Sequence, residues 1–497
     1  MIEFSQYEVW FITGSQTLYG EKTLGQVAQN SDEIVRFINY AGKLPLNVVI
    51  KPTVKSAEEV SSLCKQANYS QACIGIIIWM HTFSPAKMWI NGLKSLQLPL
   101  LHFHTQFNRD IPYNTIDMDF MNLNQSAHGD REFAHLLSKM KVHRKIMVGH
   151  WQSEHVMKEL GNWMRLALGK HRMQNMKIVR FGDNMRNVAV TDGDKVAAEI
   201  KFGFSVNTHS VGDLVSYIDA VETSSVQSLV EEYEVTYHLG PTLKANGQRR
   251  NSLKDAAKIE LGIGNFLKDG GYHAYTNTFE DLYGMKQLPG IASQRLMYAG
   301  YGFAAEGDWK TAGMLHVMKL MAKGLQGGNS FMEDYTYHFF PGEEMVLGSH
   351  MLEICPSIAD DNISCEIHPL GIGGKEDPVR LVFNAKAGKA LNVSLVDMGN
   401  RFRLILHKVE GVEVKENFPK LPTARALWKS LPDMETGLQA WLMAGGAHHT
   451  VYSQNLDIGF MKEFGEMLDV ETLLIDETTT IDDFKKDIML NEIYYRP

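Results

Sequence analysis

The stretch that decides the fold is ACIGIIIWM, residues 72–80, a run without a single charged side chain. A continuous apolar run of this length is typical of a strand that is buried on both faces of a parallel sheet. Similar runs lie before and after it, in EVWFITG (8–14), LNVVIKPTV (46–54) and LPLLHFHT (98–105). Amphipathic segments of helix length separate these runs. Strands that alternate with helices predict β-α-β units and a Rossmann-like parallel sheet.

Polar residues come directly after three of these strands, in FITGSQTLYG (11–20), IIWMHTFSP (77–85) and HFHTQFNRD (102–110). In an open parallel sheet, ligands gather at the carboxyl ends of the strands. The three loops are therefore the first candidate surface for binding.

The length of 497 residues suggests about three domains, at roughly 150 residues each. A new apolar strand begins at Met176, and the segment LQGGNS (325–330) marks a second boundary. We therefore predict an α/β protein with a Rossmann-like N-terminal α/β domain (1–175), a central α/β domain (176–326) and a C-terminal β-rich domain (327–497).

The sequence pattern of the C-terminal third is typical of antiparallel strands. Residues 380–414 alternate apolar and polar side chains, interrupted by Gly388, Gly399 and Gly411. This alternation predicts strands joined by tight turns at the glycines, and hence a sandwich or an antiparallel β-barrel-like domain.

Composition narrows the class of protein. The chain has 44% hydrophobic and 22% charged residues and a net charge of -9, so it offers no basic surface for nucleic acid. We find no secretory signal and no apolar run of about 18 residues that would span a membrane. Four cysteines without a C-x-x-C pair are typical of free thiols in a reducing compartment. We expect a cytoplasmic protein.

Acidic and histidine side chains recur in glycine-rich or apolar surroundings in the second half of the chain. They occur in GYGFAAEGDWKTA, SFMEDYTYHF, VLGSHMLEICPS and GGAHHT, which contain Glu306, Asp308, Glu333, Asp334, His338, His350, His448 and His449. Charges in such surroundings are costly unless they are paired or bound to metal. A site of two carboxylates and two imidazoles without thiolate would favour Mn²⁺, Co²⁺ or Mg²⁺.

Each cluster also has a simpler interpretation. Asp308 precedes a helix and could be its N-cap. Glu333 and Asp334 could form a solvated acidic turn, and His350 could be a hydrogen-bonded core histidine. The segment GIGGKEDP (371–378) lacks the order of a phosphate-binding loop and is expected to be a turn.

The motifs occur together and in order, and they resemble the bacterial L-arabinose isomerase family over essentially the whole chain. The most specific are EGDWKTA and SFMEDYTYHF, with WFITGSQTLYGEKTLGQV, HGDREF, VLGSHMLEICPSI and WLMAGGAHHT in support. The resemblance implies an aldose–ketose isomerase that converts L-arabinose to L-ribulose and, more weakly, D-galactose to D-tagatose. It implies Mn²⁺ bound by Glu306, Glu333, His350 and His449, and a homohexamer with active sites between subunits.

The resemblance also implies the residues that contact the sugar. These map to Gln16, Leu18, His128, Met185 and Phe279, and Asp308 and His448 are further candidates. If GGAHHTVYS forms a strand, successive side chains point to opposite faces, so only one of the two adjacent histidines can face the metal. The resemblance favours His449 as the ligand, and Gly445 and Gly446 would let the chain pass close to the sugar.

The implied reaction moves a proton between two adjacent carbons through a cis-enediol. Glu306 and Glu333 are the expected acid and base groups, because one positioned carboxylate must reach each carbon. A direct hydride shift, with both glutamates serving only as ligands, is the alternative. The rival functions are an isomerase for L-fucose or another deoxyhexose and a sugar-binding protein without catalysis.

Overall fold

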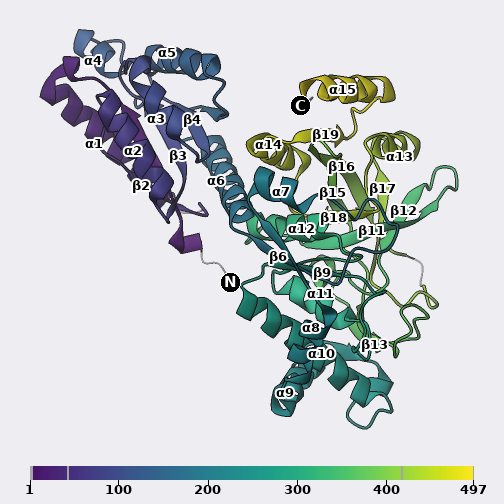
Figure 1. Cartoon of the computed structure of the whole chain (residues 1–497). Helices are drawn as coiled ribbons and strands as arrows, with labels where there is room; N and C mark the ends of the chain where they lie inside the picture. The colour runs from purple at the N-terminus through teal and green to yellow at the C-terminus, as the bar shows by residue number, and fades with distance from the viewer. Residues whose placement is uncertain (1–3, 42–43, 416–417, 496–497) are drawn as a thin grey trace. The chain divides into compact units, whose positions relative to one another are not determined.

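The structure is a computed structural model that describes residues 4–41, 44–415 and 418–495. The chain divides into two compact units, residues 1–171 and 172–497, and each is described by itself (Figure 1). No helix among the described residues is long and apolar enough to cross a membrane.

Unit 1 contains one parallel sheet of five strands in the order β2-β1-β3-β4-β5. The strands are β1 (Glu8–Gly14), β2 (Asn47–Ile50), β3 (Cys73–Met80), β4 (Leu100–His104) and β5 (Lys145–Val148). The helices are α1 (Gly20–Tyr40), α2 (Ala57–Tyr69), α3 (Ile90–Ser95), α4 (Met118–Leu123), α5 (Ser126–Lys139) and α6 (Glu154–Gln174). The predicted parallel sheet is confirmed, with the strand order of flavodoxin-like folds within the doubly wound class.

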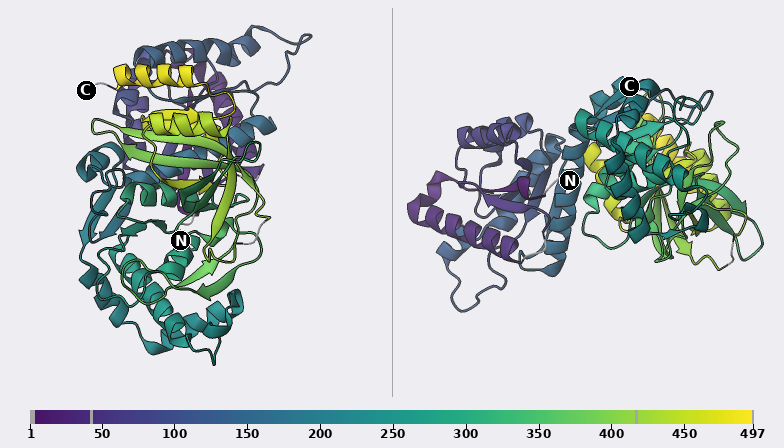
Figure 2. Two further views of the ribbon diagram at one scale, coloured as in Figure 1. Left: turned by 90° about the vertical axis from the view of Figure 1, so that its right-hand side faces the viewer. Right: turned by 90° about the horizontal axis from the view of Figure 1, so that it is seen from below.

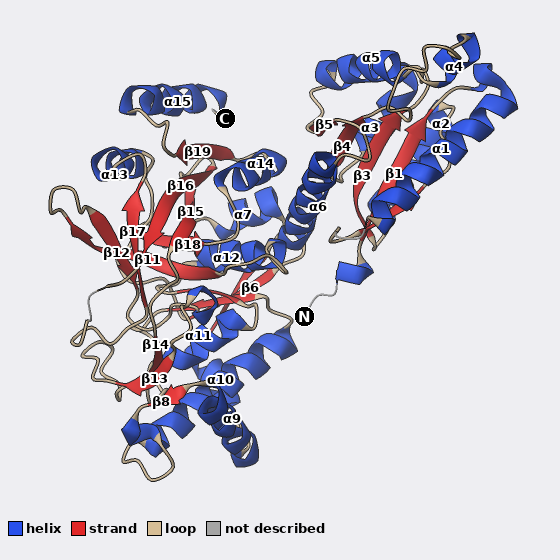
Figure 3. Ribbon diagram, turned by 180° about the vertical axis from the view of Figure 1, so that it is seen from behind, coloured by secondary structure: helices blue, strands red, loops and turns tan. Residues whose placement is uncertain are grey.

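The run at 72–80 is the centre of this sheet, as its composition predicts. Every residue of β3 is buried, because β3 lies between β1 and β4 and has helices on both faces (Figure 3). Ile76 and Ile78 pack with α2, α3 and α5, whereas Ile77 and Trp79 point to the opposite face.

Unit 2 begins with a second parallel sheet, in the order β10-β9-β6-β7. Its strands are β6 (Lys177–Phe181), β7 (Ser205–His209), β9 (Ala274–Asn277) and β10 (Gly302–Ala304). The helices in this part are α7 (Lys195–Phe202), α8 (Val211–Asp219), α9 (Thr223–Thr236), α10 (Arg250–Gly270), α11 (Gly290–Tyr298) and α12 (Trp309–Met321). A small three-stranded sheet contains β8 (His238–Leu239), β13 (Ser364–Ile367) and β14 (Val379–Val382).

The largest sheet is formed by seven strands of the C-terminal part, which lie together in both views of Figure 2. They are β11 (Asn329–His338), β12 (Met345–Ser349), β15 (Gly388–Asp397), β16 (Phe402–Val412), β17 (Arg425–Ser430), β18 (His449–Ser453) and β19 (Glu471–Ile475), with α13 (Met434–Met443), α14 (Ile458–Leu468) and α15 (Ile481–Tyr494). All neighbours are antiparallel except β19, which is parallel to β16. Strand β15, the first in this order, pairs with β18 beside it and also with β16, the last but one.

One predicted turn in this part is wrong. Gly399 does lie in the turn between β15 and β16, with φ of 86°, but Gly411 lies inside β16. A Cβ at Gly411 would lie 2.7 Å from the hydroxyl of Tyr452, so the glycine makes room for a buried ring and not for a turn.

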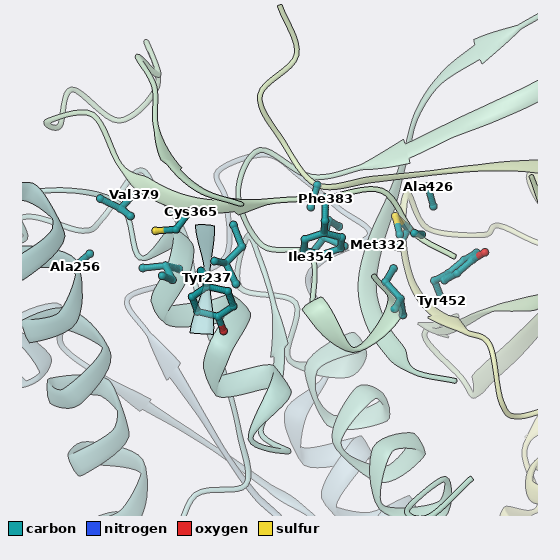
Figure 4. Packing of buried hydrophobic residues seen from close by; sticks show 14 of the residues in the cluster. Tyr237, Ala256, Met332, Ile354, Cys365, Val379, Phe383, Ala426 and Tyr452 are labelled. Atoms are coloured by element: carbon teal, nitrogen blue, oxygen red, sulfur yellow. The ribbon is translucent and has the colours of Figure 1, made fainter. Parts of the chain in front are cut away.

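A hydrophobic core joins the parts before and after residue 326. Tyr237 and Ala256 pack in the same cluster as Met332, Ala426 and Tyr452 (Figure 4). The predicted central and C-terminal domains thus share one compact unit, and their division into two domains stays a prediction.

Candidate metal and active site

Strand register brings three of the predicted ligands together. Strand β11 lies between β12 and β18, and Glu333 on β11 is paired with Ser349 on one side and with His449 on the other. His350 follows Ser349 directly at the end of β12. Glu333 and Asp334 therefore lie in a strand, and the acidic turn considered for them is wrong.

Glu306 reaches the same place from the turn between β10 and α12. Its backbone has a φ of 60°, an uncommon conformation for a residue with a Cβ, and Gly307 follows with a φ of 80°. The turn is tightly held, because the amide of Met185 donates to the Glu306 carbonyl at 3.0 Å and a Cβ at Gly307 would lie 2.6 Å from Asn184. Strained backbone of this kind clusters at functional sites.

Three of the four predicted ligands form a compact cluster, and the fourth, Glu333, lies beside it. Ligand atoms of Glu306, His350 and His449 lie within 4.8 Å of one another. Oε2 of Glu306 is 3.9 Å from Nε2 of His449, and Oε2 of Glu333 is 3.9 Å from Nε2 of His350. A divalent ion placed among the ligand atoms of Glu306, His350 and His449 could be bound by all three side chains, which we call the tight ligand group.

Each histidine has a carboxylate behind its ring. Nδ1 of His350 lies 2.6 Å from Oε2 of Glu353, and Nδ1 of His449 lies 3.1 Å from Oδ2 of Asp308. A carboxylate at Nδ1 fixes the tautomer and turns Nε2 toward the cluster, as is usual for metal-binding histidines. Glu353 is not among the residues predicted from the sequence, because its spacing of three residues from His350 is not by itself distinctive.

The donor set fits a divalent cation. Nε2 of His449 is completely buried and has no hydrogen-bond partner in the described residues, which is costly for a neutral polar atom but natural for a ligand atom. Carboxylates and imidazoles without thiolate suit a divalent cation.

The pKa shifts of His449 and Glu306 favour metal binding, whereas that of His350 favours the protonated imidazole. Burial lowers the pKa of His449, so this imidazole is kept neutral, the form that can bind a metal ion. Burial alone would raise the pKa of Glu306, but the hydrogen bond from His448 and the charges of the neighbouring imidazoles outweigh it, and the pKa lies below its usual value. Burial would lower the pKa of His350, yet the charge and hydrogen bond of Glu353 raise it.

His448 does not follow the predicted alternation of a strand. Strand β18 begins at His449, so His448 precedes it, and the two rings touch with centroids 4.3 Å apart. Nε2 of His448 lies 3.2 Å from Oε2 of Glu306, and this hydrogen bond raises the pKa of His448. His448 thus contacts the cluster through Glu306 but is not part of the tight ligand group.

The carboxylate of Asp308 is held by hydrogen bonds and an ion pair inside the protein. It is 1% exposed, caps α12 by accepting from the amide of Thr311 at 3.2 Å, and lies 3.4 Å from the ammonium group of Lys310. The N-cap interpretation is confirmed. Together with the bond to His449, these contacts favour a positioning role over the predicted contact with substrate.

Two predicted sugar-contact residues lie beside the cluster. Phe279 lines a pocket together with Glu306 and His350, and apolar side chains such as Leu352 complete its wall. Met185 contacts the turn of Glu306 through its amide. The other three, Gln16, Leu18 and His128, belong to unit 1.

The glycines before the paired histidines have a structural explanation. Gly445 follows α13 with a φ of 71°. A Cβ at Gly446 would lie 2.3 Å from the indole nitrogen of Trp441, so its absence lets the ring pack against the turn. On β9, Tyr275 is buried and donates to Ser293, whereas Asn277 lines the same pocket as Phe279.

Fold and site together define an α/β protein with a buried carboxylate–imidazole centre of the kind that binds a divalent metal. Three family descriptions match the chain: the L-arabinose isomerase N-terminal domain at residues 3–175, the central domain at 177–324 and the C-terminal domain at 328–471. The chain belongs to the L-arabinose isomerase family.

Individual relatives cover the whole chain. An L-arabinose isomerase from Enterobacter sp. (strain 638) is 54% identical over 496 residues, covering 100% of this chain and 99% of the relative. One from Yersinia pseudotuberculosis serotype O:1b (strain IP 31758) is 55% identical over 494 residues, covering 99% of each. A sugar-binding protein of an ABC sugar transporter from Legionella pneumophila matches 64% of this chain and 94% of its own, with 12% identity and a TM-score of 0.14, which is too low to indicate a shared fold.

Proposed function

We propose that this enzyme converts L-arabinose to L-ribulose. The observation that carries the proposal is the convergence of Glu306, Glu333, His350 and His449, with the Nε2 atom of His449 buried and without a hydrogen-bond partner in the described residues. Membership of the family supports the choice of sugar.

The four side chains would hold Mn²⁺, with Co²⁺ or Mg²⁺ as substitutes. The bound ion supplies Lewis-acid stabilisation of the negative charge that develops on the two reacting sugar oxygens. Asp308 and Glu353 hold the two imidazoles in the orientation that this requires.

Glu306 and Glu333 would move the proton. One carboxylate removes the proton from C2 to give the cis-enediol, and the other delivers a proton to C1 as the enediol collapses to the ketose. Over the two steps, O2 loses its hydroxyl proton and O1 gains one. Glu306 suits the role of base, because a carboxylate is ionised at neutral pH and His448 lies 3.2 Å from its Oε2. With C2-deuterated arabinose, loss of deuterium to water would support proton transfer, and full retention in the product would indicate a hydride shift.

The substrate pocket would be shared between subunits of a homohexamer. Phe279 and Met185 would contact the sugar from the subunit that holds the metal, and Gln16, Leu18 and His128 from a neighbour. In mixed hexamers, His128→Ala subunits and Glu306→Gln subunits should restore activity that neither has alone. Verified mixed hexamers without activity would contradict the shared site.

We also propose the shape of the C-terminal domain, the division into domains, the location of the protein and a second substrate. The pairings of β15 with both β16 and β18 support a barrel-like C-terminal domain. The three family matches support the three-domain division. Four buried free thiols support a cytoplasmic location. A weaker activity on D-galactose follows from the family resemblance.

The deciding experiment is a ketose assay on L-arabinose, L-fucose and D-galactose after chelation, with and without added Mn²⁺. We expect turnover to return with Mn²⁺ and kcat/KM to be highest for L-arabinose. A higher kcat/KM for L-fucose would indicate a deoxyhexose isomerase, and sugar binding without turnover would indicate a binding protein.

A further inference from the structure

Unit 1 contains a buried carboxylate that is held by two histidines. Asp130 on α5 is 2% exposed. Its Oδ1 lies 2.8 Å from Nε2 of His102 and its Oδ2 lies 2.6 Å from Nδ1 of His104. Both histidines belong to β4, two residues apart and therefore on one face of the strand. The carboxylate thus joins the first turns of α5 to the carboxyl end of the sheet.

The same turn of α5 is held at two further points. The amide of Gln125 donates to the carbonyl of His81 at 3.0 Å. A Cβ at Gly129 would lie 2.6 Å from the carbonyl oxygen of Thr82, so the helix touches the chain that follows β3. Thr82 is in turn bonded to Ser15 in the loop after β1, with 2.7 Å between the hydroxyl oxygens. The loops after β1 and β3, strand β4 and the start of α5 are therefore connected.

His128 lies on the outer side of this connected edge. It precedes Asp130 by two residues, which is about 200° around a helix, so the two side chains point to opposite sides. His128 is exposed, and its ring packs against Phe83 with centroids 4.7 Å apart. Gln16 and Leu18, the latter 82% exposed, follow Ser15 in the loop after β1.

The contacts of Asp130 are strong enough to fix the helix. A buried carboxylate that accepts two N–H groups is costly to move, because any displacement leaves a charge without its partners. Nδ1 of His102 is buried and has no hydrogen-bond partner in the part of the chain that the structure describes, which fits a ring that donates through Nε2 to Asp130. Asp130 also raises the pKa of His104, mainly through the hydrogen bond between them.

We propose that Asp130 is a positioning residue for His128: held by His102 and His104, it fixes the start of α5 so that His128 is presented to the sugar. The inference rests on the proposed function, in which His128 contacts substrate, and adds the device that places it. The contribution of His128 to the reaction depends on its fixed position, because a displacement of 1 Å can lower the rate by about 100-fold.

A double-mutant cycle with L-arabinose tests this role. Asp130→Asn should lower kcat/KM by ~10-fold or more, mostly through KM, since His128 would bind sugar and not transfer the proton. In the His128→Ala background, the same substitution should change kcat/KM by less than about twofold, because the residue that it positions is gone. Asp119→Asn, at an exposed site on α4, is the matched control and should leave the kinetics unchanged.

The kinetics of these variants distinguish a failure of the Asp130 role from a failure of the proposed sugar contact of His128. If His128→Ala alone has wild-type kinetics, the sugar contact fails and the positioning role fails with it. If His128→Ala is impaired but Asp130→Asn is either harmless or equally damaging in both backgrounds, only the role of Asp130 is overturned.

A second variant covers the case in which Asp130→Asn does not fold. His104 is about one-third exposed, so His104→Ala should fold while removing one of the two contacts. The effect of His104→Ala on kcat/KM should also disappear in the His128→Ala background. Amide hydrogen exchange at the start of α5 should be faster in this variant. Unchanged exchange there, or equal effects in both backgrounds, would overturn the inference.

Discussion

The carboxylate behind His350 offers a sharp test of the metal site. Glu353 is 7% exposed and lies 2.6 Å from Nδ1 of the histidine, where it holds the ring with Nε2 facing Glu333. A hydrogen bond that involves a charged group contributes about 1.5–3 kcal/mol. At about 1.4 kcal/mol for each factor of ten, loss of this bond weakens metal binding by roughly 10- to 100-fold. Because glutamine can still accept one hydrogen bond, Glu353→Gln should lie near 10-fold, and Glu353→Ala near 100-fold.

Calorimetric titration of Mn²⁺ into chelator-treated protein measures this directly. His350→Ala sets the scale for loss of a ligand, and Glu343→Gln, at an exposed position shortly before β12, is the matched control. A dissociation constant for Glu353→Ala within about twofold of the wild-type value would refute the reasoning, because His350 would then be oriented without its carboxylate.

Three further predictions follow from the structure. Glu306→Gln or Glu333→Gln should lower kcat by at least ~100-fold at saturating Mn²⁺, and near-normal turnover in a steady-state assay would contradict the assigned roles. His449→Ala should lose Mn²⁺ affinity by at least ~10- to 100-fold, whereas His448→Ala should keep the metal and change kcat or KM. Calorimetry that finds the reverse would overturn the assignment. Burial raises the pKa of three of the four thiols, to about 11 or 12, so at pH 8 these thiols stay protonated in the folded chain, and an aromatic disulfide reagent should react slowly until denaturant exposes all four. Rapid reaction of the native protein would show that the thiols are accessible.

The sequence predicts the local elements of unit 1 well because burial there leaves a direct signal. A strand between two others and under two layers of helices must be apolar throughout, and residues 72–80 meet this condition. The sequence does not reveal the place of Gly411, because a glycine inside a strand and a glycine in a turn look alike in sequence. Only the neighbouring Tyr452 shows why the glycine is there.

The members of the site were predictable, but their contacts were not. Resemblance to the family points to Glu306 and His449, yet nothing local says that residues 143 positions apart place atoms 3.9 Å from each other. That contact depends on the pairing of β18 with β11, which places His449, and on the turn between β10 and α12, which places Glu306. Glu353 was missed because an acidic residue three positions after a histidine has no signature until the structure shows both buried.

The position of β18 has a consequence for how the chain is made. Strand β18 pairs with β11 and β15, both of which are synthesised before it. Until residues 449–453 leave the ribosome, these two earlier strands lack a neighbour that each has in the finished protein, and the centre lacks His449. Unpaired strand edges invite association with other chains. Messages that stop short of this strand should therefore yield chains that aggregate and need chaperones, and the proposed metal site should be complete only after translation is nearly finished.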